Sequence, residues 1–510
     1  MSSLAYPHEA GSSRVLGRRL SCALARRGTD VLLGVALAVF ALVLLAEMVH
    51  DFNVDSWLAL VTGRLVWLGG IPHRETLTVM SQGQPWVDEQ WLSQLASYAI
   101  YLIGGLGLLG VVNVALLVVP VAVATFAARR LGAPFRSVLV ALPALLTIIS
   151  PSREIRTQEF AIPLFVAVAY LLVHDSRRPS RRVYWCLPIL VLWANLHGSV
   201  TLGAGLVALR GLTVAWERRR ALLHGVGAWR RPLALVLGPV AAILVTPYGL
   251  SMVGYYHATM ASGNLRQFVT EWQPVTATPV IALALFLVGG VAIWSFGRHP
   301  EKTTTWEKLA FLILLAGSIS VVRNTLFCGL LGLMIAPVSW AWGPARGPQQ
   351  SGERLRAAIN GTLGAVAILV LAAAVVVSLM RPASAIEYPA QQPRLLAAVV
   401  QATRADPSLR VLSDDHFADW LLWRDPALSG RIANDVRFEL LSTDQLDSLE
   451  NFFAVVGLDW KSAAHGYRLI VLTRTDDAGA VTGLLREPGH RILYEDSRQI
   501  VILRSAAAAG

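Results

Sequence analysis

The sequence predicts a polytopic α-helical membrane protein of about eleven helices, followed by a small C-terminal α/β domain. Of its 510 residues, 55% are hydrophobic and 15% are charged, whereas an ordinary soluble domain carries roughly 25% charged residues. Apolar runs approaching the length of about 20 residues that crosses a bilayer recur up to residue 380. Beyond residue 381, charges of both signs return between short apolar runs.

The apolar runs are predicted to form the membrane helices of a domain over residues 30–380. They lie at 30–50, 97–127, 134–149, 159–174, 184–196, 199–216, 232–247, 278–297, 309–322, 325–342 and 358–380. Several are short and fit tilted or broken helices. Residues 1–29 are basic and no small-residue cleavage site follows the first run, so we expect a cytoplasmic tail and a retained signal anchor.

The distribution of basic residues predicts the orientation of these helices. With the N-terminus in the cytoplasm, 23 arginines and lysines fall in inside segments and six fall outside before residue 381. Cytoplasmic loops of membrane proteins carry such an excess. The orientation places the C-terminal domain outside the cytoplasm. It also accounts for the net charge of +11 without nucleic acid, because no basic stripe with interleaved aromatic residues is present.

The C-terminal region, residues 381–510, is predicted to be an extracytoplasmic α/β domain. Four short runs have the pattern of strands, at 410–412, 468–473, 491–494 and 499–503, and helical stretches lie at 393–404 and 443–456. The three cysteines, Cys22, Cys186 and Cys328, lie outside the predicted outer loops and support neither a disulfide framework nor a CxxC metal site. No residue is assigned to a metal, and a divalent cation is left open.

The first outer loop, residues 51–96, carries the most informative group of candidate residues. Its segment 57–68 is amphipathic and is expected to lie along the membrane surface, with tryptophan at headgroup depth. An interfacial helix alone does not explain Asp51 and Asp55, because ionised groups beside the membrane cost free energy unless they are used or paired. The two share a face if the first helix continues. Such a carboxylate is a candidate general base towards an acceptor hydroxyl.

The remaining outer segments add cations and hydrogen-bonding groups. Each of them alone also fits an interfacial anchor, a packing histidine or a loop pair. Arg323 points more sharply to function, because it interrupts an apolar stretch with almost no loop around it. Arginines beside carboxylates suit a phosphorylated lipid, since arginine holds phosphate and delocalises leaving-group charge. The candidate phosphate-binding residues are Arg153, Arg156, Asn195, His197 and Arg323.

Taken in order, these motifs resemble the GT-C superfamily of membrane glycosyltransferases, in a bacterial and poorly characterised branch. The matching segments are Asp55-Ser-Trp57, Gly63-Arg64, Gly70-Ile-Pro72, Pro85-Trp86-Val87, Trp91-Leu92, Arg156-Thr-Gln158, Trp193-Ala-Asn195-Leu-His197-Gly198, Pro247-Tyr248-Gly249, Glu271-Trp272, Arg323-Asn324, Asp419-Trp-Leu-Leu-Trp423 and Asn434-Asp435-Val-Arg437. They span nearly the whole chain. Each is short, so the specificity lies in their order and common sidedness.

The resemblance implies inverting transfer of a sugar from a polyprenyl-phosphate donor to a glycan, lipid or protein acceptor outside the cytoplasm. It implies a multi-pass protein of the bacterial inner membrane. The family's catalytic aspartate matches Asp55, or Asp51 in another register, and Asp88 or Glu89 matches a second acidic residue. The residues expected to contact substrate from the loops are Trp57, Trp86, Tyr248, Glu271 and Trp272.

Two departures from the family pattern leave a second hypothesis open. Many relatives have Trp-Trp-His after the aspartate, where this chain has Ser56-Trp57-Leu58, and many have glutamate in the place of Gln90. These changes fit a different substrate, or a non-catalytic protein that binds a lipid-linked glycan or scaffolds envelope assembly. A secondary transporter is disfavoured, because the sequence has no paired helices broken by glycine or proline.

Overall fold

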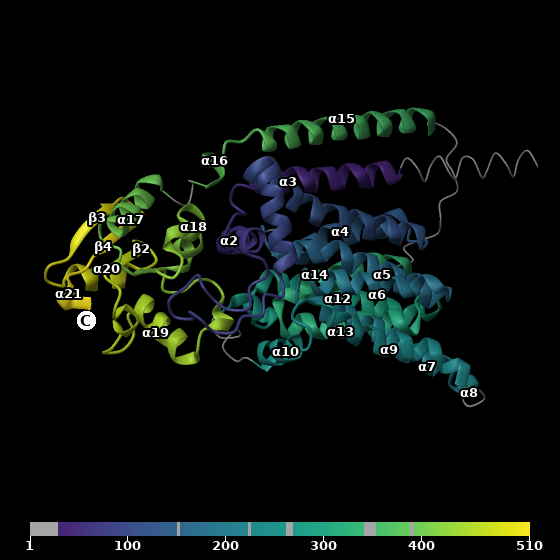
Figure 1. Cartoon of the computed structure of the whole chain (residues 1–510). Coiled ribbons are helices and arrows are strands. Elements are labelled where there is room, and N and C mark those ends of the chain that lie inside the picture. Colours follow the sequence, from purple (N-terminus) through teal and green to yellow (C-terminus); the bar gives the residue numbers. More distant parts are fainter. Residues whose placement is uncertain are drawn as a thin grey trace, which may run out of the picture.

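The computed structural model describes residues 29–149, 154–222, 226–261, 269–340, 353–387 and 392–509. In Figure 1 a long helical bundle carries a smaller α/β unit at one end. Every predicted apolar run contains a helix. These are Thr29–Glu47, α3 (Trp91–Arg130), α4 (Phe135–Ile149), α5 (Ala161–Arg177), α6 (Cys186–Ala194), α7 (Val200–Glu217), α9 (Arg230–Ile243), α12 (Pro279–Arg298), α13 (Thr305–Ser320), α14 (Thr325–Ser339) and α15 (Glu353–Leu379).

The chain is a multi-pass membrane protein. Within the described residues, seven helical segments are long and apolar enough to cross a membrane. The other four predicted runs form the helices α4, α6, α9 and α13, which have only 9 to 16 residues. α3 is in fact two helices, because Gly104 and Gly105 leave the helical conformation and Gly105 has φ 65°, a value that glycine adopts readily.

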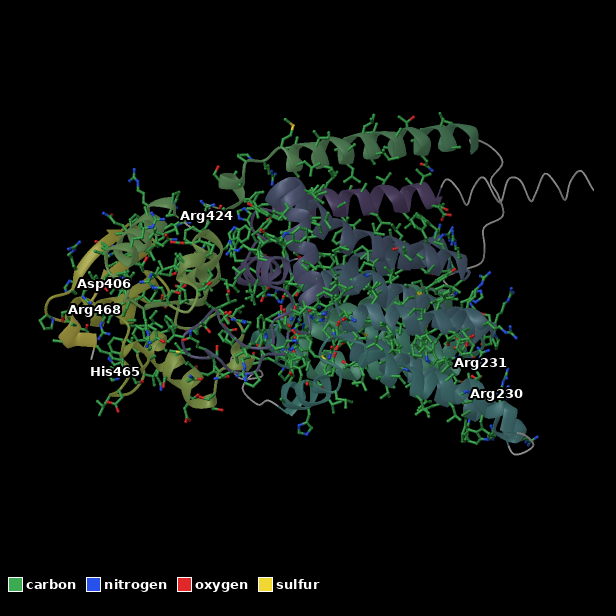
Figure 2. The ribbon with its side chains drawn as sticks, in the orientation of Figure 1. Arg230, Arg231, Asp406, Arg424, His465 and Arg468 are labelled. Atoms are coloured by element: carbon green, nitrogen blue, oxygen red, sulfur yellow. The ribbon has the colours of Figure 1, made fainter. Side chains whose placement is uncertain are left out.

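α8 (Arg219–Leu222) belongs to a segment that was predicted to be inside, and it lies at the end of the bundle opposite the α/β unit (Figure 1). Arg230 and Arg231 are found there in Figure 2. Beneath them, Arg210 and Asp175 are both fully buried and form an ion pair of 2.9 Å, and Arg231 also contacts Asp175. Pairing of this kind is what allows charged side chains to be buried in a helical bundle.

The first outer loop contains the predicted helix, α2 (Val54–Gly69), which begins at an N-cap formed by Asn53. The preceding helix ends at Glu47, so it does not continue through Asp51 and Asp55, and these two residues do not share one helical face. Tryptophan in this helix was expected to face the lipid headgroups. Trp57 does not, because it is 1% exposed and packs in the core. The α/β unit covers this side of α2 and removes the side chain from solvent and lipid.

The α/β unit contains one four-stranded sheet in the order β1-β2-β4-β3. The strands are β1 (Val411–Ser413), β2 (Leu469–Thr473), β3 (Arg491–Glu495) and β4 (Gln499–Leu503). β1 and β2 are parallel, while β4 is antiparallel to both β2 and β3. Each strand lies within one residue of its predicted position, so this part of the prediction is confirmed.

Alternating side chains on β2 separate the two faces of this sheet, as strand geometry requires. Leu469 and Val471 pack with α17 (Pro393–Ala405) and α18 (Asp415–Arg424), while Ile470 and Leu472 pack with α19 (Thr443–Ala454) and α20 (Ala478–Leu485). The first cluster continues into α2 through Trp57. Burial of this apolar surface fixes the α/β unit on the loop that carries Asp55. Shorter helices are α8 (Arg219–Leu222), α10 (Ser251–Ala261), α16 (Ala383–Glu387) and α21 (Ala506–Ala509).

Candidate active site

Asp55 and Arg156 form an ion pair at the outer end of the bundle. Asp55 lies in the first turn of α2, and Arg156 precedes a short 3-10 helix over Thr157–Phe160, so both side chains are held by helix starts. The Nε atom of Arg156 is 2.9 Å from Oδ2 of Asp55. Arg156 also contacts the carboxylates of Glu154 and Glu271.

The electrostatics of this cluster keep Arg156 ionised. Burial by itself lowers the pKa of Arg156, but the carboxylates of Asp55, Glu271 and Glu154 outweigh it and raise that pKa above its usual value. Arg156 was predicted to hold a phosphate. In this structure its guanidinium contacts three carboxylates, and its phosphate-binding role stays a prediction.

Asp88 and Glu89 lie side by side in the loop before α3, and both are buried. One carboxylate oxygen of Asp88 accepts hydrogen bonds from the side chain of Gln94 at 2.9 Å and from the backbone of Gln90 at 3.3 Å. Among the described residues, the other oxygen has no hydrogen-bond partner. Burial, assisted by Glu89, raises the pKa of Asp88 to about 8, and burial raises the pKa of Glu89 as well. Asp88 is therefore mostly protonated at neutral pH.

Arg323 contacts two uncharged side chains. Its Nε donates to Oε1 of Gln158 at 2.5 Å, and its Nη2 lies 2.9 Å from Nε2 of His197. Burial, and then the charge of Arg323, lowers the pKa of His197, so the imidazole is neutral. His197 Nδ1 lies 2.8 Å from Ser199 Oγ and accepts from the backbone N–H of Ser199 at 3.0 Å. Within the described residues, no carboxylate lies within 4 Å of Arg323.

Two adjoining cavities connect these groups. The larger, of about 290 Å³, is lined by residues that include His197, Trp272 and Arg323. The smaller, of about 50 Å³, is lined by residues that include Asp55, Trp86 and Asp88. Both cavities are also lined by Glu89, Gln90 and Glu439. The carboxylates of the first outer loop and the guanidinium of Arg323 thus open onto neighbouring spaces.

The α/β unit completes the smaller cavity with Arg437 and Glu439. Arg437 is buried, forms ion pairs with Asp435 and Glu75, and places its guanidinium carbon 4.4 Å from the centre of the Trp86 ring. Burial, and then Glu89, raises the pKa of Glu439 to about 7. Arg437 belongs to a segment noted in the sequence, but the sequence assigned it no role, and Glu75 and Glu439 gave no signal there.

Several predicted site residues lie outside both cavities. The amide of Asn195 accepts from Trp91 at 3.1 Å and donates to two backbone carbonyl groups, so it fastens loops together. The hydroxyl of Tyr248 donates to the backbone oxygen of Pro72 at 2.7 Å. Asp51 is buried in the bend before α2. The others are Trp57 in the core under the α/β unit, and the ion-paired Glu271 and Arg156, while Arg153 falls outside the described residues.

The cavity carboxylates supply no cluster of metal ligands in the part of the chain that the structure describes. The one group of three potential ligands found there, Asp414, Asp415 and His416, lies on the α/β unit. A cation held by a single cavity carboxylate and substrate phosphate remains compatible with this geometry, because Mg²⁺ is often bound in that way.

Comparison with known proteins finds similar folds among solved membrane protein structures. No protein-family model and no curated protein matches the chain. Among solved structures, apo ArnT from Cupriavidus metallidurans is similar with a TM-score of 0.50 at 14% identity, over 93% of this chain and 98% of ArnT. ArnT bound to undecaprenyl phosphate gives 0.48 over the same shares. The oligosaccharyltransferase AglB from Archaeoglobus fulgidus, in complex with an inhibitory peptide and a dolichol-phosphate, gives 0.49 at 11% identity, over 86% of this chain and 69% of AglB.

The likeness to ArnT extends over both the helical bundle and the α/β unit, since it covers nearly all of each chain. At 14% identity, this likeness shows a shared fold and does not show a shared substrate. The chain therefore has an ArnT-like fold over nearly its whole length.

Proposed function

We propose that this protein is a membrane glycosyltransferase that moves a sugar from a polyprenyl-phosphate donor to an acceptor outside the cytoplasm. The observation that carries the proposal is the position of Arg323. Its guanidinium lines the cavity of about 290 Å³ and contacts only neutral partners in the described chain, while Asp55 lines the adjoining cavity. The guanidinium of Arg323 is therefore available to an anionic ligand, and the carboxylate of Asp55 lines the adjoining cavity.

The larger cavity suits the phosphate and the sugar of such a donor. Arg323 would form charge-assisted hydrogen bonds with the phosphate and stabilise the charge that develops on it as the leaving group. Leu202, Phe327 and Tyr256 give the cavity an apolar wall. A phosphate beside an apolar wall matches a lipid-linked donor.

In the proposed reaction, Asp55 accepts the proton of an acceptor hydroxyl whose oxygen attacks the anomeric carbon. The bond from that carbon to the donor phosphate breaks, and the phosphate leaves with the electron pair. Burial raises the pKa of Asp88 to about 8, so its protonated form would donate a hydrogen bond to a sugar hydroxyl. Arg156 would act as a positioning residue through its ion pair with Asp55.

The second hypothesis is a non-catalytic protein of the same fold that binds a lipid-linked glycan. The replacement of glutamate by Gln90 favours it, since Gln90 lines both cavities and cannot accept a proton as a base. The two hypotheses agree on ligand binding and differ on turnover. We also propose the bacterial inner membrane as the location, with the N-terminus in the cytoplasm and both cavities facing outward.

The test uses the full chain in liposomes with a panel of polyprenyl-phosphate sugars and an envelope extract as acceptor. Wild type should transfer at least one sugar, and Asp55→Asn should reduce the rate by about 10²–10⁴-fold, the usual contribution of a general base. Asp459→Asn, at an exposed position on the α/β unit, is the matched control and should retain activity. A folded Asp55→Asn protein that transfers at the native rate would sink the base assignment. Donor binding without transfer by wild type would favour the second hypothesis.

A further inference from the structure

The helices α5 to α9 carry a large excess of arginine at the end of the bundle opposite the α/β unit. Residues 161–243 contain ten arginines, no lysine and only two acidic residues, Asp175 and Glu217. The arginines fall into three groups, at 177–182, 218–220 and 230–231, and Arg210 lies within α7. Figure 1 shows α8 at this end, and Figure 2 shows the labelled side chains of the third group there, away from both cavities.

The buried carboxylate of Asp175 brings these groups together. It forms ion pairs with Arg210 of α7, at 2.9 Å, and with Arg231 of α9. The same carboxylate accepts from the backbone N–H of Ser180 at 2.9 Å, and Arg231 donates to the backbone oxygen of Ser180 at 3.3 Å. One side chain thus joins the end of α5, the segment before the 3-10 helix η3 (Arg181–Trp185), the middle of α7 and the start of α9.

The acidic residues of this segment are occupied by these contacts, so the surrounding arginines keep an uncompensated charge. Glu217 pairs with Arg210 at 3.1 Å, and Arg177 takes its partner, Glu307, from α13. The exposed arginines of residues 161–243 that form no ion pair with a described residue are Arg178, Arg181, Arg182, Arg218, Arg219 and Arg230. Like charges held on neighbouring helix ends repel one another, and an anion from outside the chain would reduce that repulsion.

Exposed tryptophan and leucine side chains beside these arginines indicate the kind of anion that fits. Trp185 is 65% exposed and Trp216 is 69% exposed. The guanidinium carbon of Arg219 lies 4.8 Å from the centre of the Trp216 ring. Tryptophan in membrane proteins is enriched at headgroup depth. The exposed side chains of Leu212 and Leu233 lie about one turn further into the bundle, on α7 and α9. A ligand of this surface therefore contacts both cations and apolar groups.

The orientation of the helices explains the number of positive charges but not their arrangement. Arginines on any cytoplasmic loop satisfy the positive-inside tendency. Here they lie on adjoining helices, because α7 and α9 approach closely at Gly211. A Cβ atom at this position would lie 2.9 Å from the backbone oxygen of Pro232. Close packing of α7 on α9, together with the contacts of Asp175, concentrates the charge on one part of the surface.

We propose that this arginine surface binds the headgroup of an anionic phospholipid. Arg181, Arg182 and Arg230 would hold the phosphate, and the acyl chains would lie along Leu212 and Leu233. Arginine suits this role because its planar fork forms paired hydrogen bonds with phosphate oxygens. Basic pockets between membrane helices bind lipid headgroups in this way, so a lipid with two phosphates should bind more tightly than one with a single phosphate. The site is independent of the proposed transfer reaction.

The experiment titrates phosphatidylglycerol, cardiolipin or phosphatidylcholine into the full chain in neutral detergent and counts bound lipid by native mass spectrometry. Wild type should bind cardiolipin most tightly and phosphatidylcholine least. The combined variant Arg181→Gln, Arg182→Gln and Arg230→Gln should raise the apparent Kd for the anionic lipids by roughly 5-fold per arginine, or roughly 100-fold in all, since each cation near an anionic lipid surface contributes about that much. The corresponding lysine variant keeps the charge and should lose much less.

The matched control removes the same charge from other helix ends that were also predicted to be inside. Arg130→Gln, Arg136→Gln and Arg298→Gln change three exposed arginines on α3, α4 and α12, and this protein should bind lipid as wild type does. Melting in neutral detergent checks folding, and both variants should melt near wild type because the side chains are exposed. Equal lipid affinity in the two glutamine variants would overturn the proposal. So would equal binding of phosphatidylcholine and phosphatidylglycerol by wild type, or full displacement of the lipid by inorganic phosphate at the same concentration.

Discussion

Asp55 and Arg156 form an ion pair, with Nε 2.9 Å from Oδ2, that joins the start of α2 to the segment before α5. The side chain of Arg156 is only 20% exposed and also contacts Glu154 and Glu271. One cation thus holds three carboxylates that would otherwise repel one another. This relationship makes Arg156 as important for the shape of the candidate site as Asp55 is for its proposed chemistry.

Arg156→Gln should therefore destabilise the protein and reduce transfer. Removal of Arg156 leaves three partly exposed carboxylates without their cation, and the loss of such a partner costs about 1–3 kcal/mol. Thermal unfolding in detergent measures the loss. Arg486→Gln, at an exposed position on the α/β unit, should change the melting temperature little. Equal melting of the two variants would contradict the role given to Arg156.

Arg323→Gln should weaken donor binding while leaving the fold intact. A hydrogen bond to a charged group contributes about 1.5–3 kcal/mol, so the Kd for a polyprenyl-phosphate ligand should rise roughly 10–150-fold. Arg323→Lys should restore part of the affinity, since it keeps the charge and loses the fork geometry. Binding to reconstituted protein measures the effect, with Arg486→Gln as the control. Unchanged affinity in Arg323→Gln would contradict the proposed role of Arg323 in binding the donor phosphate.

The raised pKa of Asp88 predicts a pH-dependent difference between wild type and Asp88→Asn. In the folded state the pKa is about 8, whereas an exposed aspartate titrates near 3.9. Between these values the unfolded chain binds fewer protons than the folded chain, so wild-type stability falls as pH rises. Asp88→Asn should gain in melting temperature relative to wild type from pH 5 to about pH 8, and the gain should level off above that. Asp459→Asn should show no such trend, and a flat difference for Asp88→Asn would contradict the burial argument.

Gly63 lies at a close approach between α2 and α3. A Cβ atom at this position would lie 2.2 Å from the backbone oxygen of Gln94, and a backbone oxygen cannot rotate away. Gly63→Ala should lower the free energy of unfolding by about 1–3 kcal/mol, the usual cost of overpacking, and should displace Asp55 along with α2. Activity should fall with stability.

Gly69→Ala is the matched control, because it lies on the same helix with open space around it. That substitution should be neutral or stabilising by up to about 1 kcal/mol, since alanine favours helix. Equal melting temperatures for Gly63→Ala and Gly69→Ala would show that α2 and α3 separate more easily than the structure indicates.

Much of the fold follows from local patterns. The apolar runs, the helix in the first outer loop and the strands of the α/β unit are all found where hydrophobic periodicity placed them. The prediction that Asp51 and Asp55 share a helical face is wrong, because it required the first helix to continue past Glu47. A turn follows Glu47 instead. Trp57 was misplaced for another reason, since an amphipathic pattern does not tell whether lipid or another domain covers the apolar face.

The sequence by itself determined a polytopic membrane bundle, the sheet-forming segments and the loops that carry charge. The tertiary structure alone decided which charges meet. It paired Asp55 with Arg156, gave Arg323 two neutral partners, and brought Arg437 of the α/β unit over Trp86 of the first outer loop. The physical reason is the distance along the sequence between the interacting residues. Hydrophobic periodicity reports only on neighbouring residues within one helix or strand. Ion pairing and burial join segments hundreds of residues apart, whose proximity depends on how the whole chain packs.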